Sequence, residues 1–191
     1  MDLRTCGSIR EISILSIKIL PFVGVKIPVI SFIDTPGAYP GIESEERGMS
    51  EAIAKNLSLL SNLKTPVIVI ITGEGGSGGA LAIGIGDHVC MLEHSIYAVA
   101  SPEACASIVW RDGSKAKDAA EAMKVDAGSL QKLGLVDEVI KEPLGGAHRD
   151  LRGASNSISD VIEEKLSTFD EIEISDLLNK RYKKIMSYGS I

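Results

Sequence analysis

Glycines crowd one short stretch of the chain, ITGEGGSGGALAIGIGD at residues 71–87, which follows an apolar run and ends on an aspartate. Ordering a glycine on folding costs more backbone entropy than ordering any other residue, so such a cluster indicates that something lies close to the main chain. Four explanations fit: a nucleoside triphosphate, a dinucleotide pyrophosphate, an oxyanion formed during a reaction, or a tight turn that packs a helix closely on a strand.

A triphosphate site is excluded by the lack of cations around the turn. The phosphate-binding loop of nucleoside triphosphatases has the pattern GxxxxGK[ST], in which the lysine reaches the terminal phosphates. No lysine or arginine occurs between Pro66 and Trp110. The chain therefore lacks the charge that this chemistry requires.

A dinucleotide site has partial support. Gly73, Gly75 and Gly78 satisfy GxGxxG between an apparent strand and a helix, and Glu93 follows at the distance typical of a ribose-binding carboxylate. The helix expected after the turn is too short for an ordinary crossover, however, and Glu93 falls between two short strands. A surface carboxylate in a hairpin is the commoner explanation of a glutamate there, and the Rossmann-type interpretation remains an alternative.

The third explanation is a site for an anionic oxygen at the start of the helix. Gly78 and Gly79 lie where the strand turns into a helix, so their N–H groups are expected to be unpaired and to favour negative charge. Two such donors, aimed at a developing charge, stabilise a transition state by about 3 kcal/mol or more. The competing explanation, a turn that serves packing alone, stays open at this point.

The elements that must position this turn alternate between strands and helices. PVISFIDTPG at residue 28 and PVIVIITGEG at residue 66 share an apolar pattern, and each runs into a glycine turn. A helix over 43–63 should separate them, with Ser44 as its N-cap and a Glu51–Lys55 pair on its surface. This repeat predicts a layered α/β domain with parallel strands.

Further elements follow in the second half. Short strands are expected over 88–92 and 96–100, a helix opening at Ser101-Pro102, and helices near 115–123 and 127–133. After a short strand in 135–140 and a polar connection at 142–157, the tail should form two amphipathic helices. Leu178, Tyr182 and Ile185 recur on one side of the second, which favours an interface.

Composition limits the function classes. The 191 residues carry a net charge of −6 and are 45% hydrophobic, which argues against general binding to nucleic acids or to anionic membrane surfaces. Cys6, Cys90 and Cys105 form no paired framework, so a reducing compartment is expected. Lysines and prolines interrupt the apolar residues 12–33, which is atypical of a membrane span.

Several long stretches resemble the carboxyltransferase α subunits of multi-subunit acetyl-CoA carboxylase. They are PVISFIDTPGAYPGIESEERGMSEAIAKNL, GEGGSGGALAIGIGD, SPEACASIVW, AAEAMKV, EPLGGAHRD and KRYKKIMSYGS, in order from Pro28 to about Gly189. The resemblance implies an α/β, crotonase-like (ClpP/crotonase) fold of repeated ββα units with C-terminal helices. It implies three segments: an atypical segment 1–27, a carboxyltransferase core 28–157 and interface helices 158–191.

The resemblance also implies an activity, the transfer of a carboxyl group from carboxybiotin on a carrier protein to acetyl-CoA. The product is malonyl-CoA, made in the first committed step of fatty acid biosynthesis. Gly78 and Gly79 would be the catalytic donors on the carboxybiotin side. The substrate-binding residues would be Gly75, Gly76, Gly37, Ala38 and Tyr39. Departing CO₂ would leave biotin basic enough to take the acetyl proton.

Partners and cofactors are implied in the same way. The chain would work with a β subunit in an α₂β₂ complex, with the biotin carboxyl carrier protein and with biotin carboxylase. It would bind no cofactor itself, and zinc would belong to the β subunit alone. The location would be the bacterial cytoplasm or the plastid stroma. Residues 1–27 depart from the family, which suggests a truncated form and leaves a catalytically silent scaffold as the alternative function.

A few other residues could do chemistry. Glu103 at a helix start is placed like an acid–base carboxylate, although a favourable helix-dipole charge explains it better. Cys105 has no histidine nearby in sequence and suits a small buried residue. His88 and His94 have no metal-ligand spacing. Whether Arg47 and His148 border a site is left open by the sequence.

Overall fold

The computed structural model describes residues 27–189. Its strands form one parallel sheet in the order β1-β2-β3-β5, and β4 pairs with the far end of β2. The strands are β1 (Val29–Thr35), β2 (Val67–Gly76), β3 (His88–Leu92), β4 (Ile96–Ala98) and β5 (Glu138–Ile140). The segment 1–27 that departs from the family lies, except for Ile27, outside the described residues.

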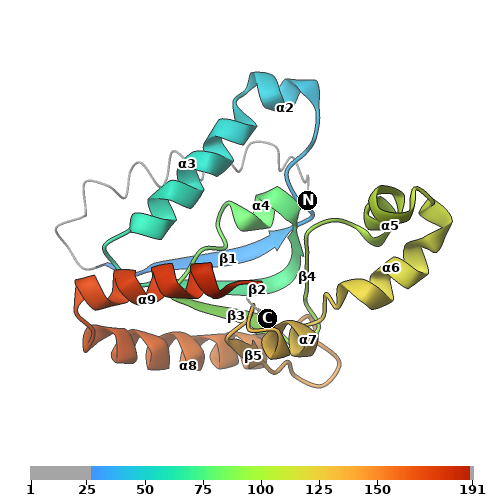
Figure 1. Cartoon of the computed structure of the whole chain (residues 1–191). Helices are drawn as coiled ribbons and strands as arrows, with labels where there is room; N and C mark the ends of the chain where they lie inside the picture. The colour runs from blue at the N-terminus through green and yellow to red at the C-terminus, as the bar shows by residue number, and fades with distance from the viewer. Residues whose placement is uncertain (1–26, 190–191) are drawn as a thin grey trace.

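Helices connect the strands and cover the sheet (Figure 1). The helices are α2 (Ile42–Glu46), α3 (Met49–Asn62), α4 (Ser77–Leu81), α5 (Pro102–Trp110), the 3₁₀ turn η3 (Gly113–Lys115), α6 (Ala116–Met123), α7 (Ala127–Lys132), α8 (Leu151–Asp170) and α9 (Ile174–Ser187). Helices α5 and α6 project from the sheet beyond β4, whereas α8 and α9 run beside it. None of the helices in the described part is long and apolar enough to cross a bilayer.

The central strand β2 is buried on both faces, as expected for a parallel sheet covered by helices. On one face Val67, Val69 and Ile71 pack with residues of α3, α4 and α7. On the other face Ile68 and Ile70 pack against the apolar stripe of α8. The two halves of the predicted repeat are β1 and β2, which pair in parallel with Val29 opposite Val67. The layered α/β prediction is confirmed.

Local structure follows the sequence in places. Ser101 caps α5 by accepting a hydrogen bond from the Ala104 N–H at 3.2 Å, and Pro102 is the first helical residue. The expected Glu51–Lys55 pair forms at 2.6 Å.

The helix predicted over 43–63 is wrong in two respects. Gly48 adopts a positive φ of 76° and divides it into α2 and α3. Ser44 is buried inside α2 and is not its N-cap, because the helix begins one turn earlier, after Gly41. The glycine breaks the helix because its φ lies in the left-handed region, which a continuous right-handed helix does not contain.

Other bounds shift as well. The stretch ALAIGIG at residues 80–86 predicts the helix after the glycine turn, whereas α4 begins at Ser77 and ends at Leu81. Strands β4 and β5 are shorter than expected, and α8 starts at Leu151, so the polar connection ends before residue 151. The last shift arises because Asp150 caps α8 by accepting a hydrogen bond from the Gly153 N–H at 2.9 Å.

Helix α9 buries Leu177 and Arg181 against the rest of the protein. Of the stripe expected to form an interface, Tyr182 is more than half exposed and Leu178 and Ile185 are half-buried, and its role in an interface stays a prediction. The charged Arg181 can be buried because each of its five N–H groups donates a hydrogen bond within the protein.

Candidate functional site

Two loops meet at the carboxyl ends of the neighbouring strands β1 and β2. One is residues 36–39 after β1, and the other is residues 75–79, where β2 passes into α4. A Cβ at Gly79 would lie 2.7 Å from the carbonyl carbon of Gly37 and 2.9 Å from the Ala38 nitrogen. A Cβ at Gly76 would meet the carbonyl oxygen of Pro36. We call these two loops the glycine junction, in which backbone packs directly on backbone.

The first loop is held in place by hydrogen bonds at the end of β1. The Gly37 N–H donates to Thr35 Oγ1 at 3.3 Å, and Gly37 has a φ of 130°, which side chains rarely tolerate. The Asp34 carboxylate accepts a hydrogen bond from the Glu74 N–H at 3.0 Å. The pairing between β1 and β2 shifts register between Ile33 and Thr35. These contacts fix the two loops relative to each other.

Packing also explains Gly75. A Cβ there would lie 2.7 Å from the Tyr97 ring and 3.3 Å from the carbonyl oxygen of Ile96, both on β4. Burial raises the pKa of Tyr97 above its usual value, consistent with a ring embedded beneath the junction. The glycine therefore lets β4 approach the end of β2 closely.

Gly78 differs from its neighbours. A Cβ at Gly78 would meet only the Ile53 Cδ1, at an ordinary 3.5 Å. Close packing does not require a glycine at this position. Ser77 just before it is exposed and has a φ of 46°, one of the few positive values at a non-glycine residue in the described chain.

The N–H groups of the first turn of α4 have no acceptor within their own helix. Gly78 and Gly79 both belong to that turn, and Gly78 is half-buried, so solvent or a ligand can reach its backbone. Such N–H groups can donate hydrogen bonds to an anionic oxygen.

The structure packs Gly37 and Ala38 against Gly76 and Gly79, as the sequence assignment of the site requires. The other assigned residues, Tyr39, Gly75 and Gly78, lie on the same two loops. Tyr39 is the most exposed of them at 65%, and its ring lies against Gly41. Their proximity is a geometric finding, and their roles in binding and catalysis stay predictions.

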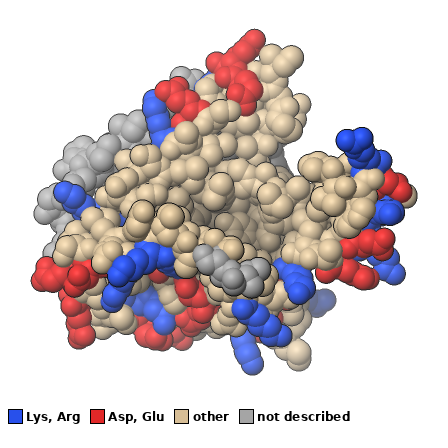
Figure 2. Space-filling model, viewed as in Figure 1, with Lys and Arg blue, Asp and Glu red and all other residues tan. Residues whose placement is uncertain are grey.

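Asp34 and Glu74 are charged residues at the edge of the junction. Figure 2 shows a hollowed, largely uncharged surface between the part of the molecule that carries α2 and α3 and the part that carries α5 and α6. The charged groups on this face gather at its rim. A hollow of this kind suits a ligand that is held by backbone groups and apolar surface.

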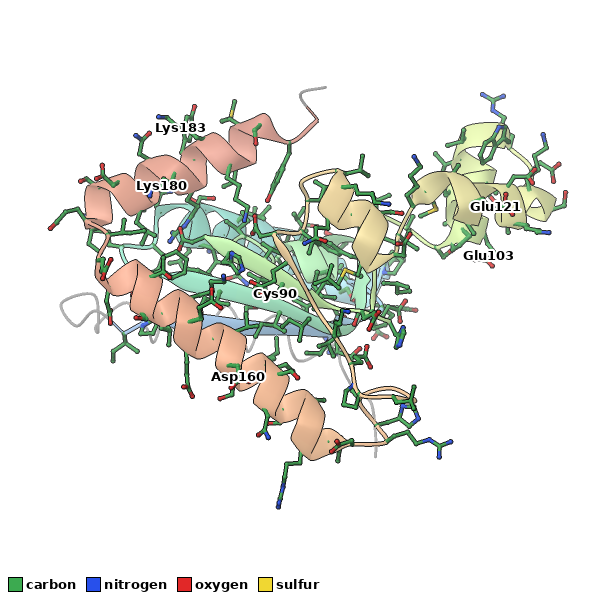
Figure 3. All side chains as sticks on the ribbon, turned by 90° about the horizontal axis from the view of Figure 1, so that it is seen from below. Cys90, Glu103, Glu121, Asp160, Lys180 and Lys183 are labelled. Atoms are coloured by element: carbon green, nitrogen blue, oxygen red, sulfur yellow. The ribbon has the colours of Figure 1, made fainter. Side chains whose placement is uncertain are left out.

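Other candidates lie on separate elements. Glu103 is exposed in the first turn of α5, where its charge is favourable to the helix dipole, and Cys105 is half-buried on the same helix. Figure 3 shows Glu103 and Glu121 on the projecting α5–α6 unit. Arg47 is the C-cap of α2, and His148 is exposed in a turn before α8. None of these elements belongs to the two loops of the junction.

The sequence did not predict one cluster of possible metal ligands. His88 and Cys90 on β3 lie beside Glu138 on β5, and the possible ligand atoms of the three all fall within 4.8 Å of one another. Sequence spacing tests His88 only together with His94, as a possible pair of metal ligands. His94 is exposed in the turn after β3. The useful signal was the i, i+2 spacing of His88 and Cys90 within a strand, which places both side chains on one face.

The dinucleotide interpretation is wrong for this fold. Helix α4 has five residues, which is too short for the crossover helix of a dinucleotide-binding unit. Glu93 is an exposed residue in the turn after β3. Its backbone N–H donates to the Ile140 carbonyl at 3.0 Å, so it belongs to the join between β3 and β5.

Comparison with known proteins gives a consistent result. Residues 24–189 match the family model described as acetyl co-enzyme A carboxylase carboxyltransferase-like. The chain is 57% identical over 166 residues to the acetyl-coenzyme A carboxylase carboxyl transferase subunit alpha of Alcanivorax borkumensis, and 56% identical over 163 residues to that of Vibrio cholerae. These matches cover 87% and 85% of this chain but 51% of each relative, so the chain spans about half their length.

Solved structures share the fold. The transcarboxylase 12S structure with hydrolysed methylmalonyl-coenzyme A aligns over 66% of this chain and 26% of its own, at a TM-score of 0.57 and 26% identity. A Pseudomonas malonate decarboxylase hetero-tetramer with coenzyme A aligns over 88% and 67%, at a TM-score of 0.72 and 18% identity. An enoyl-CoA hydratase/isomerase from Marinobacter aquaeolei aligns over 96% and 74%, at a TM-score of 0.56 and 14% identity. The crotonase-like fold expected from the sequence is confirmed.

Proposed function

Because the chain belongs to the acetyl-coenzyme A carboxylase carboxyltransferase-like family, we propose that it is the α part of an acetyl-CoA carboxyltransferase. The reaction moves a carboxyl group from carboxybiotin on a carrier protein to the acetyl group of acetyl-CoA and yields malonyl-CoA. This is the committed step that supplies fatty acid biosynthesis.

The close approach of the two loops of the glycine junction is the observation that supports this function. The N–H groups of Gly78 and Gly79 are proposed to donate to the ureido oxygen of carboxybiotin, on which negative charge develops as CO₂ departs. The freed biotin nitrogen takes a proton from the acetyl methyl group, and the resulting enolate attacks CO₂. This sequence needs no acid–base side chain, in keeping with the largely uncharged surface of the hollow.

Gly75, Gly76, Gly37, Ala38 and Tyr39 would form the walls of the substrate site. The glycines let the backbone approach the substrate, and the exposed Tyr39 ring offers an apolar surface beside it. A β subunit would complete the site in an α₂β₂ complex, supplied by the biotin carboxyl carrier protein and biotin carboxylase. The named relatives are α subunits, which supports a multi-subunit assembly.

No cofactor is proposed for the glycine junction itself, and the zinc expected in the assembly is assigned to the β subunit. The relatives named above come from bacteria, which favours the bacterial cytoplasm over the plastid stroma as the location.

A second candidate is a silent scaffold that keeps only surfaces for binding the partner. The chain spans about half the length of each relative, so the activity of the whole protein is a proposal for this chain. A mixing assay separates the two: this chain, a β subunit from a bacterial relative, carboxylated free biotin and acetyl-CoA, with detection of malonyl-CoA. Malonyl-CoA above the level made by the β subunit alone supports the enzyme, whereas a stable complex without product supports the scaffold.

A further inference from the structure

The cluster of His88, Cys90 and Glu138 lies on the sheet face opposite α4 and the glycine junction. Strands β3 and β5 are parallel, and Cys90 pairs in register with Glu138. His88 precedes Cys90 by two residues, so the three side chains share one face of the sheet. This is the face that α8 covers, and Figure 3 shows Cys90 on the sheet beside that helix.

The donor atoms are close enough for one small cation. His88 Nε2 lies 3.0 Å from Glu138 Oε2, and the Cys90 Sγ completes a group whose atoms all fall within 4.8 Å. Ligands of a tetrahedral zinc ion lie about 3.5 Å apart, given bonds of about 2.0–2.3 Å. Small side-chain rotations would therefore bring all three onto one ion.

The site is closed on its inner side and open at the edge of the sheet. Cys90 is fully buried, whereas the side chains of His88 and Glu138 are 17% and 31% exposed. Strand β5 is the terminal strand of the order β1-β2-β3-β5, so an ion can enter beside it. A solvent molecule at the open side would supply the fourth ligand, as in zinc sites with three protein ligands.

Two carboxylates give the cluster negative charge. Glu138 lies beside His88 and Cys90, and Asp137 lies near the His88 ring, so both attract a cation. A cation bound at the thiol would displace its proton. Asp137 Oδ2 lies 3.9 Å from His88 Nδ1, too far for a hydrogen bond, and accepts instead from the Val89 N–H and from Lys184.

Lysines neutralise the carboxylates when no ion is bound. Lys165 lies 3.2 Å from Glu138 but also 2.7 Å from Glu164, and Lys184 pairs with Asp137. Lys165 therefore has a second partner to which it can turn when the Glu138 carboxylate binds an ion.

We propose that His88, Cys90 and Glu138 form a binding site for Zn²⁺ or a similarly soft divalent cation that clamps β3 to β5 beneath α8. The thiol, imidazole and carboxylate set suits zinc and disfavours Mg²⁺ and Ca²⁺, which take oxygen ligands. Binding forms the metal–sulfur bond and releases the thiol proton to water. The inference is independent of the carboxyltransferase proposal.

Cobalt titration of the whole chain tests the site. In a Cys6→Ser/Cys105→Ser background, Cys90 is the one remaining cysteine, so a thiolate-to-cobalt absorption band reports on it alone. We expect one equivalent of Co²⁺ to produce the band and Zn²⁺ to displace it. His88→Gln and Glu138→Gln should each weaken Zn²⁺ binding more than tenfold, and Cys90→Ala should abolish the band and weaken Zn²⁺ binding further.

Lys165→Met should change Zn²⁺ affinity in the opposite direction. Removing the competing ammonium should tighten Zn²⁺ binding severalfold, because a like charge no longer opposes the ion. Zn²⁺ should also raise the melting temperature of the background protein but not of Cys90→Ala. Should Cys90→Ala fail to fold without metal, the half-exposed Glu138→Gln gives the same comparison.

Absence of the cobalt band in the folded background protein would overturn the proposal. So would Zn²⁺ affinity that is unchanged by Glu138→Gln and Lys165→Met, since adventitious binding elsewhere would then explain it. Neither result bears on malonyl-CoA formation, which is measured separately.

Discussion

The guanidinium of Arg181 and the carboxylate of Asp87 form a buried, two-pronged ion pair across 94 positions of sequence. Nε and one terminal nitrogen of Arg181 donate to the two carboxylate oxygens at 2.9 and 2.5 Å. The remaining N–H groups donate to the carbonyls of Leu60, Leu63 and Thr65 at 2.7–2.9 Å. One side chain of α9 therefore caps α3 and ties it to the turn before β3.

Arg181→Met should destabilise the protein by about 3–5 kcal/mol, because it leaves the Asp87 charge and three carbonyl groups buried without this partner. Denaturant unfolding followed by circular dichroism measures the change. The matched control is Lys183→Met on the exposed side of α9, which should alter stability by less than about 0.5 kcal/mol.

Arg181→Met combined with Asp87→Asn tests the coupling. If the two residues act as a pair, the double variant should lose clearly less than the sum of the single variants. Simple additivity would show that each residue acts through separate contacts.

The glycine junction predicts different effects for two adjacent glycines. Gly79→Ala should push residues 37–38 away, because its Cβ would lie 2.7 Å from backbone. We expect a loss of about 1–3 kcal/mol in stability from overpacking. The shift of the loops moves the Gly79 N–H away from the reacting oxygen, so carboxyl transfer by the complex with a β subunit should fall on the order of a hundredfold.

Gly78→Ala is the control for that variant. Its Cβ has room and its N–H is kept, so the free energy of unfolding should change by less than about 1 kcal/mol and activity should persist. The larger Gly78→Val tests access to the junction, and we expect it to lower turnover on the order of a hundredfold. Normal transfer by a folded Gly79→Ala complex would contradict the assigned role of the junction.

Alkaline pH should destabilise the protein through Cys90. Its pKa is raised from 9.0 to about 12 in the fold, so above pH 9.0 the unfolded chain releases a proton that the folded chain keeps. Stability contributed by the neutral thiol is therefore present below pH 9.0 and lost as pH rises toward 12. Between about pH 8 and about pH 10, metal-free protein should lose about 1 kcal/mol more stability than Cys90→Ala.

Cys105→Ala provides the comparison for this measurement. It should keep the alkaline loss of stability, because Cys90 remains in place. Parallel pH curves for the wild-type chain and Cys90→Ala would show that the thiol does not carry the effect.

Exposed apolar residues on α5 should make the isolated chain self-associate. Ile108, Val109 and Trp110 are 76%, 62% and 40% exposed on the projecting α5–α6 unit. Sedimentation at about micromolar concentration should show species larger than a monomer, since contiguous exposed apolar patches promote association. Ile108→Glu should shift the distribution toward monomer, whereas Leu144→Glu, at a fully exposed loop position, should not.

The sequence alone predicted those features of the protein that depend on interactions between residues close together in the chain. The strands at residues 28 and 66, the turn of glycines between strand and helix, and the Ser101 cap all depend on neighbours within a few positions. The quoted stretches also carried the family resemblance, which the comparisons confirmed. Ser44 shows the limit of this reasoning, because a serine beside acidic residues suits a cap whether or not the helix begins there.

Only the tertiary structure decided which distant residues meet. The register of β1 against β2 brings residues 36–39 against 76–79, and that of β3 against β5 sets Glu138 beside Cys90. Arg181 is charged, so a hydrophobic pattern assigns it to solvent, yet five hydrogen bonds satisfy it inside the protein. Hydrophobic periodicity specifies which face of an element is buried, but strand pairing and hydrogen-bond satisfaction depend on partners that sequence spacing does not contain.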